Sequence, residues 1–169
     1  SCSSLSKTYS VTGWRLGYAL GNKEILKQMI KIHQYAIMCA PTVSQYAAIE
    51  AMYNGDQDVI YMRESYNQRR RFLYHELQRL GLPCFLPEGA FYMFPDIREF
   101  GMTSEDFALD LLKEEKVAVV PGSAFGDCGE GFIRISYAYS IEELKEALLR
   151  IERYLNRKRS QKTESPKQV

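Results

Sequence analysis

The stretch that decides the fold is residues 4–17, which read Ser4-Leu5-Ser6-Lys7-Thr8-Tyr9-Ser10-Val11-Thr12-Gly13-Trp14-Arg15-Leu16-Gly17. Its central feature is Lys7, which lies among small hydroxyl residues just ahead of a strand-like segment. A lysine amine forms a Schiff base with a carbonyl compound when burial or nearby cations favour the neutral amine. Arg15 supplies a planar guanidinium suited to phosphate, and Ser4 and Ser6 supply hydroxyl donors. From the residues alone, an exposed polar loop is the other interpretation.

The spacing around this lysine resembles a known motif. A serine stands three residues before Lys7, a small residue stands directly before it, and the pattern Gly-x-Arg-x-Gly follows at residues 13–17. This pattern resembles the pyridoxal-phosphate attachment motif of the class I/II aminotransferases. The resemblance implies that the cofactor is pyridoxal 5'-phosphate, held covalently by Lys7, which then moves a proton between the substrate α-carbon and the cofactor. It also implies that Arg15 and Ser4 bind the cofactor phosphate, with Ser6 as a further donor.

The resemblance extends to about residue 157 and includes three later segments, residues 88–95, 117–126 and 132–138. The last of these resembles the family strand that carries the substrate-binding arginine. Arg134 stands alone there between apolar neighbours, and a buried guanidinium requires an anion. The resemblance implies that Arg134 binds the α-carboxylate of the substrate, and the alternative is an internal ion pair with an acidic side chain. Phe91 and Tyr92 are interpreted mainly as core residues of a strand.

The hydrophobic pattern predicts a mixed α/β and α+β chain in two units. We expect residues 1–54 to form the last part of a large pyridoxal-phosphate-binding domain of fold type I, as the resemblance implies. Residues 55–157 are expected to form a linking helix and a small α+β C-terminal domain. Residues 158–169 are polar and basic without periodicity, which predicts a disordered tail.

Turn and capping residues mark the expected elements. We expect Asn22 to cap one helix, Pro41 to stand in the first turn of the next, and Thr103 to cap a later one. Ser140 with Glu143 predicts a capping box at the start of the last helix. The expected strands cover residues 15–20, 82–86, 90–94, 117–120 and 132–136, and the expected helices include residues 57–80 and 104–115.

Composition excludes several classes of function. The net charge of +1 gives no general attraction to nucleic acid or to a membrane surface, and no apolar run approaches the ~20 residues that span a bilayer. His33 and His75 are isolated, so no metal site is expected. The four cysteines are scattered, which indicates reduced thiols and a cytoplasmic protein.

The resemblance also implies features that these 169 residues do not carry. Ahead of the lysine, family members carry an aspartate that pairs with the pyridine nitrogen and an aromatic residue that stacks on the ring. We therefore expect this chain alone to be inactive and to retain the cofactor weakly or not at all, and the full-length protein to be a homodimer.

The expected substrates are an amino acid and a 2-oxo acid. No residue specifies the substrate side chain, although the segment most resembles the prokaryotic aspartate-aminotransferase-like subgroup. Two alternatives remain open. One is a lyase or synthase of the same fold, and the other is a non-catalytic small-domain fragment.

Overall fold

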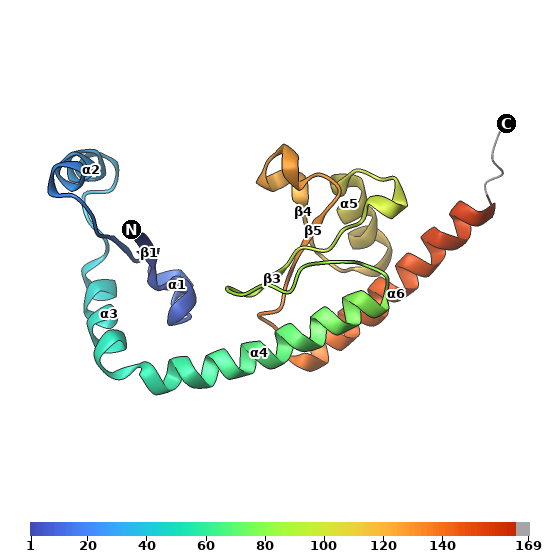
Figure 1. Ribbon diagram of the computed structural model, residues 1–169, viewed down its shortest axis with the longest axis horizontal. Coiled ribbons are helices and arrows are strands. Elements are labelled where there is room, and N and C mark those ends of the chain that lie inside the picture. Colours follow the sequence, from blue (N-terminus) through green and yellow to red (C-terminus); the bar gives the residue numbers. More distant parts are fainter. Residues whose placement is uncertain (165–169) are drawn as a thin grey trace. The chain divides into compact units, whose positions relative to one another are not determined.

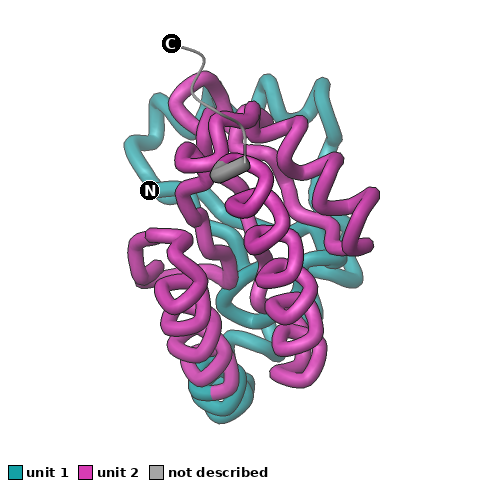
Figure 2. Tube along the Cα trace, turned by 90° about the vertical axis from the view of Figure 1, so that its right-hand side faces the viewer, with its two compact units in different colours: residues 1–64 teal, residues 65–169 magenta. Residues whose placement is uncertain are grey.

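The computed structural model describes residues 1–164 of the 169-residue chain. It forms two compact units, unit 1 (Ser1–Glu64) and unit 2, which begins at Ser65 (Figure 2). The boundary falls inside α4 (Asp56–Arg79), so one continuous helix belongs to both units. None of the described helices is long and apolar enough to cross a bilayer.

Unit 1 begins with a two-stranded antiparallel pair, β1 (Cys2–Ser4) and β2 (Gly17–Ala19), labelled with the other elements in Figure 1. The short helices α1 (Leu5–Thr8) and η1 (Thr12–Trp14) lie between the two strands in sequence. We expected a strand over residues 15–20, and the structure has β2 within this range. The strand is shorter, because Arg15 adopts a left-handed conformation, and it pairs with β1.

Two helices, α2 (Lys23–Ala36) and α3 (Thr42–Asn54), follow in unit 1. The predicted cap of α2 is confirmed, because the Asn22 side chain accepts the Glu24 N–H at 2.8 Å. Pro41 precedes α3 as its N-cap residue rather than standing in its first turn. The helix α2 has no buried residue, and apart from the partly buried Leu26 its apolar side chains are exposed.

Unit 2 contains a three-stranded antiparallel sheet in the order β3 (Tyr92–Met93), β5 (Ile133–Ser136), β4 (Val120–Pro121). All three strands are shorter than expected. Residues 82–86 form no strand, because Gly81 (φ +75°) ends α4 and turns Leu82 into the core. A positive φ at Ala90 similarly delays the start of β3.

The helices of unit 2 begin where the sequence predicts. Thr103 caps α5 (Ser104–Glu115) by accepting the Asp106 N–H at 3.1 Å. The capping box of α6 (Ile141–Glu164) is confirmed, since Ser140 Oγ accepts the Glu143 N–H and the Glu143 carboxylate accepts the Ser140 N–H. The short helices η2 (Arg98–Phe100), η3 (Gly122–Phe125) and η4 (Asp127–Gly129) connect the other elements.

One continuous core stabilises unit 2. It gathers buried side chains from the second half of α4, the sheet, α5 and α6, among them Leu73, Leu77, Met93, Phe107, Leu111, Ile133, Leu148, Tyr154 and Leu155. Tyr137 donates its hydroxyl to the Ala90 carbonyl at 3.0 Å, and Tyr154 donates to Asp110 at 2.9 Å. The buried phenols are therefore satisfied within a closed interior.

The expected disordered tail was wrong for residues 158–164, because α6 continues to Glu164. The basic side chains that suggested disorder are held by acidic and carbonyl partners. Lys158 pairs with Asp110 at 2.5 Å, Arg159 pairs with Glu99, and Lys162 donates to the Glu99 carbonyl. The rest of the expected tail, residues 165–169, lies outside the described residues.

Candidate active site

The lysine segment is shaped by the cap of a very short helix. Ser4 has extended backbone angles and caps α1, and its hydroxyl accepts the Ser6 N–H at 3.1 Å. Lys7 stands in the last turn of α1 and is exposed. Ser6 is buried, with 9% of its surface exposed, whereas Ser4 is exposed. Of the two serines, Ser4 is therefore the more exposed residue, and its hydroxyl also donates to the Leu16 carbonyl at 3.5 Å.

Strand pairing brings the segment that follows Arg15 beside the end of β1. In the register of β1 and β2, Ser4 lies opposite Gly17, and the Leu5 N–H donates to the Leu16 carbonyl at 3.2 Å. Arg15 ends η1 in a left-handed conformation (φ 52°), which is uncommon for a residue other than glycine, and its Nη1 donates to the Thr12 carbonyl at 3.0 Å. Strained residues of this kind cluster at functional sites.

Gly17 makes this pairing possible. A Cβ at this position would lie 2.7 Å from the Ser3 carbonyl oxygen, so only glycine permits the close approach of the two strands. Gly13 is different, because a Cβ there would meet nothing within 4 Å. The two glycines of the motif therefore have different structural roles, which sequence spacing alone does not distinguish.

The donors in this part of unit 1 fit pyridoxal phosphate. Lys7, Arg15 and Ser4, which carry an amine, a guanidinium and a hydroxyl, are all exposed residues of the segment that the β1–β2 pairing closes. Arg15 makes no ion pair with any residue that the structure describes, so its charge is available to a phosphate. An amine for the aldehyde, with a cation and a hydroxyl for the phosphate, is the set that this cofactor requires.

Arg134 stands on β5 in unit 2, where its strand neighbour across the sheet is Val120. Its Nε is buried and has no hydrogen-bond partner among the described residues. The guanidinium carbon instead lies 4.4 Å from the centroid of the Tyr92 ring and 4.9 Å from that of Phe125. No described acidic side chain pairs with it, so the internal ion pair considered from sequence is not observed.

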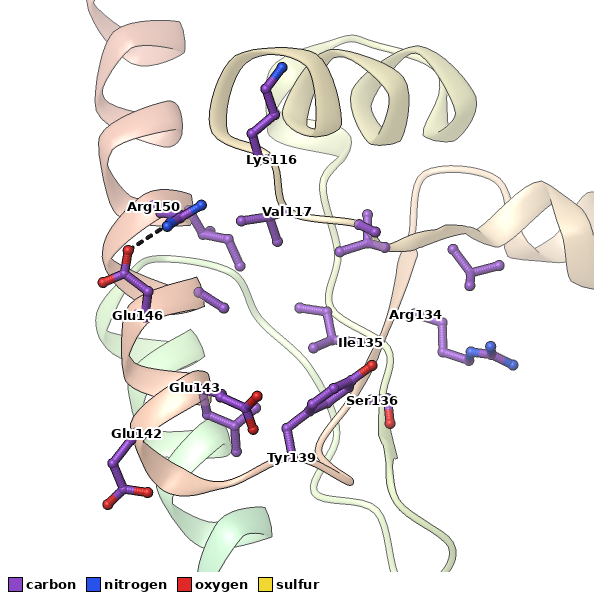
Figure 3. Close-up of a pocket in the computed structure, with 16 residues that line it drawn as sticks. Lys116, Val117, Arg134, Ile135, Ser136, Tyr139, Glu142, Glu143, Glu146 and Arg150 are labelled. Carbon is purple, nitrogen blue, oxygen red and sulfur yellow. Dashed lines mark hydrogen bonds and ion pairs between the residues drawn. The ribbon is translucent and has the colours of Figure 1, made fainter. Parts of the chain in front are cut away.

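An apolar groove lies beside Arg134, between residues 117–120, β5 and the first turns of α6 (Figure 3). Ile135 points toward α6, whereas the guanidinium of Arg134 points away from that helix, as alternation along a strand requires. Glu146 and Arg150, both on α6, form an ion pair at 2.7 Å at the edge of the groove. The charged end of Arg134 therefore faces a different region from the centre of this groove.

The aromatic neighbours of Arg134 were not identified as site residues from sequence. Tyr92 was interpreted mainly as core, and Phe125 was only part of the quoted segment 117–126. The structure places Tyr92 partly exposed on β3 and Phe125 about half exposed at the end of η3. The sequence did place an aromatic residue, Phe125, in a glycine-rich loop, which could have marked it as a candidate. The direction in which its ring points depends on tertiary packing.

These elements define the class of protein. The sequence model of the family described as "Aminotransferase class I and II" matches residues 1–151, and the chain therefore belongs to this family. The expected family is thus confirmed. The expected fold class is confirmed as well, because the similar solved structures have the aspartate-aminotransferase-like fold type I.

Individual relatives support the same conclusion. A putative aminotransferase of Bacillus subtilis, YugH, is 54% identical over 155 residues, which are 92% of this chain and 40% of that protein. An aspartate aminotransferase of Pyrococcus abyssi is 46% identical over 156 residues, 91% of this chain and 40% of that protein. The solved aromatic aminotransferase of Pyrococcus horikoshii is 45% identical with a TM-score of 0.87, covering 94% of this chain and 43% of that one. The chain thus spans about 40% of the length of its curated relatives.

Proposed function

We propose that this chain carries the cofactor lysine and the substrate arginine of a pyridoxal-phosphate-dependent aminotransferase. The enzyme would transfer an amino group between an amino acid and a 2-oxo acid. The observation that supports the proposal is the β1–β2 pairing, which sets Ser4, three residues before Lys7, opposite Gly17, two residues after Arg15. Membership of the family supports it.

Each residue has a role that its geometry permits. Lys7 Nζ attaches the cofactor and afterwards takes and returns the proton at the substrate α-carbon. Arg15 and Ser4 bind the phosphate, and Ser6 is a further donor if its buried hydroxyl turns toward it. When bound, pyridoxal phosphate supplies an electron sink that stabilises negative charge at the α-carbon. Arg134 binds the substrate α-carboxylate through its N–H donors.

The wider assignment follows from the same proposal. Residues 1–54 are the last part of the cofactor-binding domain, and residues 55–157 are the linking helix and the small domain. We further propose a cytoplasmic homodimer for the whole enzyme. The 169 residues alone would not transaminate, because the relatives named aminotransferases are about two and a half times as long, as their 40% coverage implies.

The proposal can be tested in a chimaera. Residues 1–155 of this chain replace the matching part of the Pyrococcus abyssi aspartate aminotransferase, and the purified protein is loaded with pyridoxal phosphate and reduced with borohydride. We expect a stable adduct at Lys7, found by peptide mass spectrometry, and glutamate formation from aspartate and 2-oxoglutarate. The matched control is Lys23→Ala, at an exposed lysine that begins α2.

Two outcomes decide the test. Loss of the adduct in Lys7→Ala, with the adduct kept in Lys23→Ala, supports the proposal. An adduct that persists in Lys7→Ala, or a folded chimaera that binds the cofactor at another lysine, overturns it.

A further inference from the structure

Arg134 is held by aromatic rings from two different elements. In the sheet register Tyr92 lies opposite Ser136, so it is the diagonal neighbour of Arg134 on the adjacent strand. Phe125 comes from η3, which follows β4, and β4 pairs with β5 on the edge opposite to β3. Both rings lie within the distance at which a guanidinium and an aromatic face attract each other.

The two rings are themselves fixed by their neighbours. Phe91 packs against Tyr92 with ring centroids 4.7 Å apart, and Phe94 meets Phe125 edge to face at 5.9 Å. The loop that carries Phe125 is tied to the strand of Arg134, because the Gly122 N–H donates to the Phe132 carbonyl at 2.8 Å. A Cβ at Gly122 would lie 1.9 Å from the Gly129 carbonyl oxygen, so the loop holds one compact conformation. Phe125 is therefore held in position although it is about half exposed.

The chemistry of these neighbours differs from that of the usual arginine partner. A carboxylate would hold a guanidinium equally well, but it would neutralise the charge and occupy the N–H donors. Aromatic faces attract the cation through their quadrupole and accept no strong hydrogen bond. The Nε of Arg134 is buried and has no partner among the described residues, so this donor is left unsatisfied. The charge is fixed in place and remains available.

From this geometry we propose that Tyr92 and Phe125 are positioning residues for substrate binding, because they hold the Arg134 guanidinium in place without neutralising it. The ligand of this site is a carboxylate, bound in the plane of the guanidinium. This inference rests on the proposed function, in which Arg134 binds the substrate α-carboxylate. It adds the two residues that keep Arg134 ready for that carboxylate.

The geometry can be tested in the 169-residue chain without cofactor. The Arg134 Nε–H resonance, assigned by its loss in Arg134→Lys, should be shifted upfield by the ring currents of the two aromatic neighbours. Tyr92→Leu and Phe125→Leu should each move this resonance downfield, whereas Tyr92→Phe should leave it in place. The control Phe85→Leu removes a ring that is 95% exposed and should have no effect. An Nε–H resonance that does not respond to loss of either ring overturns the proposed packing.

The role in binding is tested by steady-state kinetics of the chimaera. Tyr92→Leu and Phe125→Leu should each raise KM for 2-oxoglutarate about tenfold, on the scale of one desolvated cation–π contact, and change kcat by less than about threefold. Tyr92→Phe should restore KM to within about twofold of the parent value, because it keeps the ring. A loss confined to kcat, or a Tyr92→Phe variant as impaired as Tyr92→Leu, overturns the positioning role.

Arg134→Lys separates this inference from the function on which it rests. If Arg134→Lys raises KM while the two leucine variants do not, the positioning role is wrong and the proposed function stands. If Arg134→Lys leaves KM unchanged, Arg134 does not bind the carboxylate, and both proposals fail.

Discussion

The two compact units both carry motifs of the same family, yet they bury their side chains very differently. In residues 1–64, all of which the structure describes, Leu5 and Ala48 are the only buried apolar residues. In the described part of unit 2, one core joins helices and sheet and leaves many side chains with no exposed surface. A motif for chemistry can therefore lie in a segment that does not stabilise itself.

The helices α2 and α5 show the difference most clearly. The helix α5 buries five of its twelve residues, whereas α2 buries none of its fourteen. Ile32 is 72% exposed and Tyr35 is 96% exposed, although apolar side chains gathered on a helix normally face another surface. Isolated helices of this length are marginal in water, so packing decides whether they persist. We infer that interactions within unit 2 contribute most of the free energy of unfolding of the 169-residue chain.

Paired truncations should produce the largest difference. Leu77 on α4 is fully buried in unit 2, and Leu77→Ala should lower the free energy of unfolding by about 2–5 kcal/mol, because it leaves a cavity. Ile32→Ala in unit 1 should change it by less than about 0.5 kcal/mol. The measurement is urea denaturation of the 169-residue chain, followed by circular dichroism. Equal losses for the two variants would contradict the contrast between the units.

Substitutions of the two glycines in the lysine motif test whether the β1–β2 pairing organises this segment, although unit 1 buries few side chains. Gly17→Ala should destabilise the β1–β2 pairing by about 1–3 kcal/mol, because the new Cβ would overlap the Ser3 carbonyl. The readouts are faster hydrogen exchange of the Leu5 amide and weaker cofactor retention in the chimaera. Gly13→Ala is the matched control, since open space surrounds that position. Similar behaviour of the two variants would show that strand pairing does not organise the lysine segment.

Removing one helix cap in each unit should give a smaller difference in stability between the units. Ser140→Ala should lower the stability of unit 2 by about 1 kcal/mol, because it removes the capping box of α6. Asn22→Ala removes an equivalent cap from α2 but should leave the main urea transition unchanged, because α2 has no buried residue. Thermal and urea unfolding of both variants provide the measurement. A shift for Asn22→Ala as large as that for Ser140→Ala would mean that α2 is part of the cooperative core.

Features that depend on residues close together in sequence were predicted well, and features that depend on distant residues were not. Caps and helices depend on residues two to four positions apart, so the caps Asn22, Thr103 and Ser140 were predicted correctly. Strand lengths depend on left-handed residues such as Arg15 and Ala90, which a hydrophobic pattern does not reveal. The family motif identified Lys7 and Arg134 as candidates, whereas the aromatic packing of Arg134 depends on tertiary contacts that spacing cannot give.

The charge pattern of residues 158–164 also failed to predict their structure, because their partners are distant in sequence. A polar, basic segment without apolar periodicity usually indicates disorder, yet residues 158–164 are helical. Their partners, Asp110 and Glu99, lie far away in sequence, so the ion pairs could not be anticipated from the segment itself. Residues 158–164 have no apolar face, and ion pairs with residues distant in sequence hold this end of α6 instead.

The smallest expected effect concerns one of these contacts and its dependence on pH. The Lys158 ammonium, with help from the Tyr154 hydroxyl, lowers the pKa of the Asp110 carboxyl below its ordinary value of 3.8. Because the folded pKa is below the unfolded one, this stabilisation is complete above about pH 4 and is lost as the pH falls through the folded pKa. Asp110→Asn should therefore cost about 1 kcal/mol or less at pH 7 and little at pH 2, since the pair is partly exposed. Urea unfolding at both pH values measures this difference, and an equal loss at pH 2 and pH 7 would show that Asp110 stabilises α6 by packing rather than by its charge.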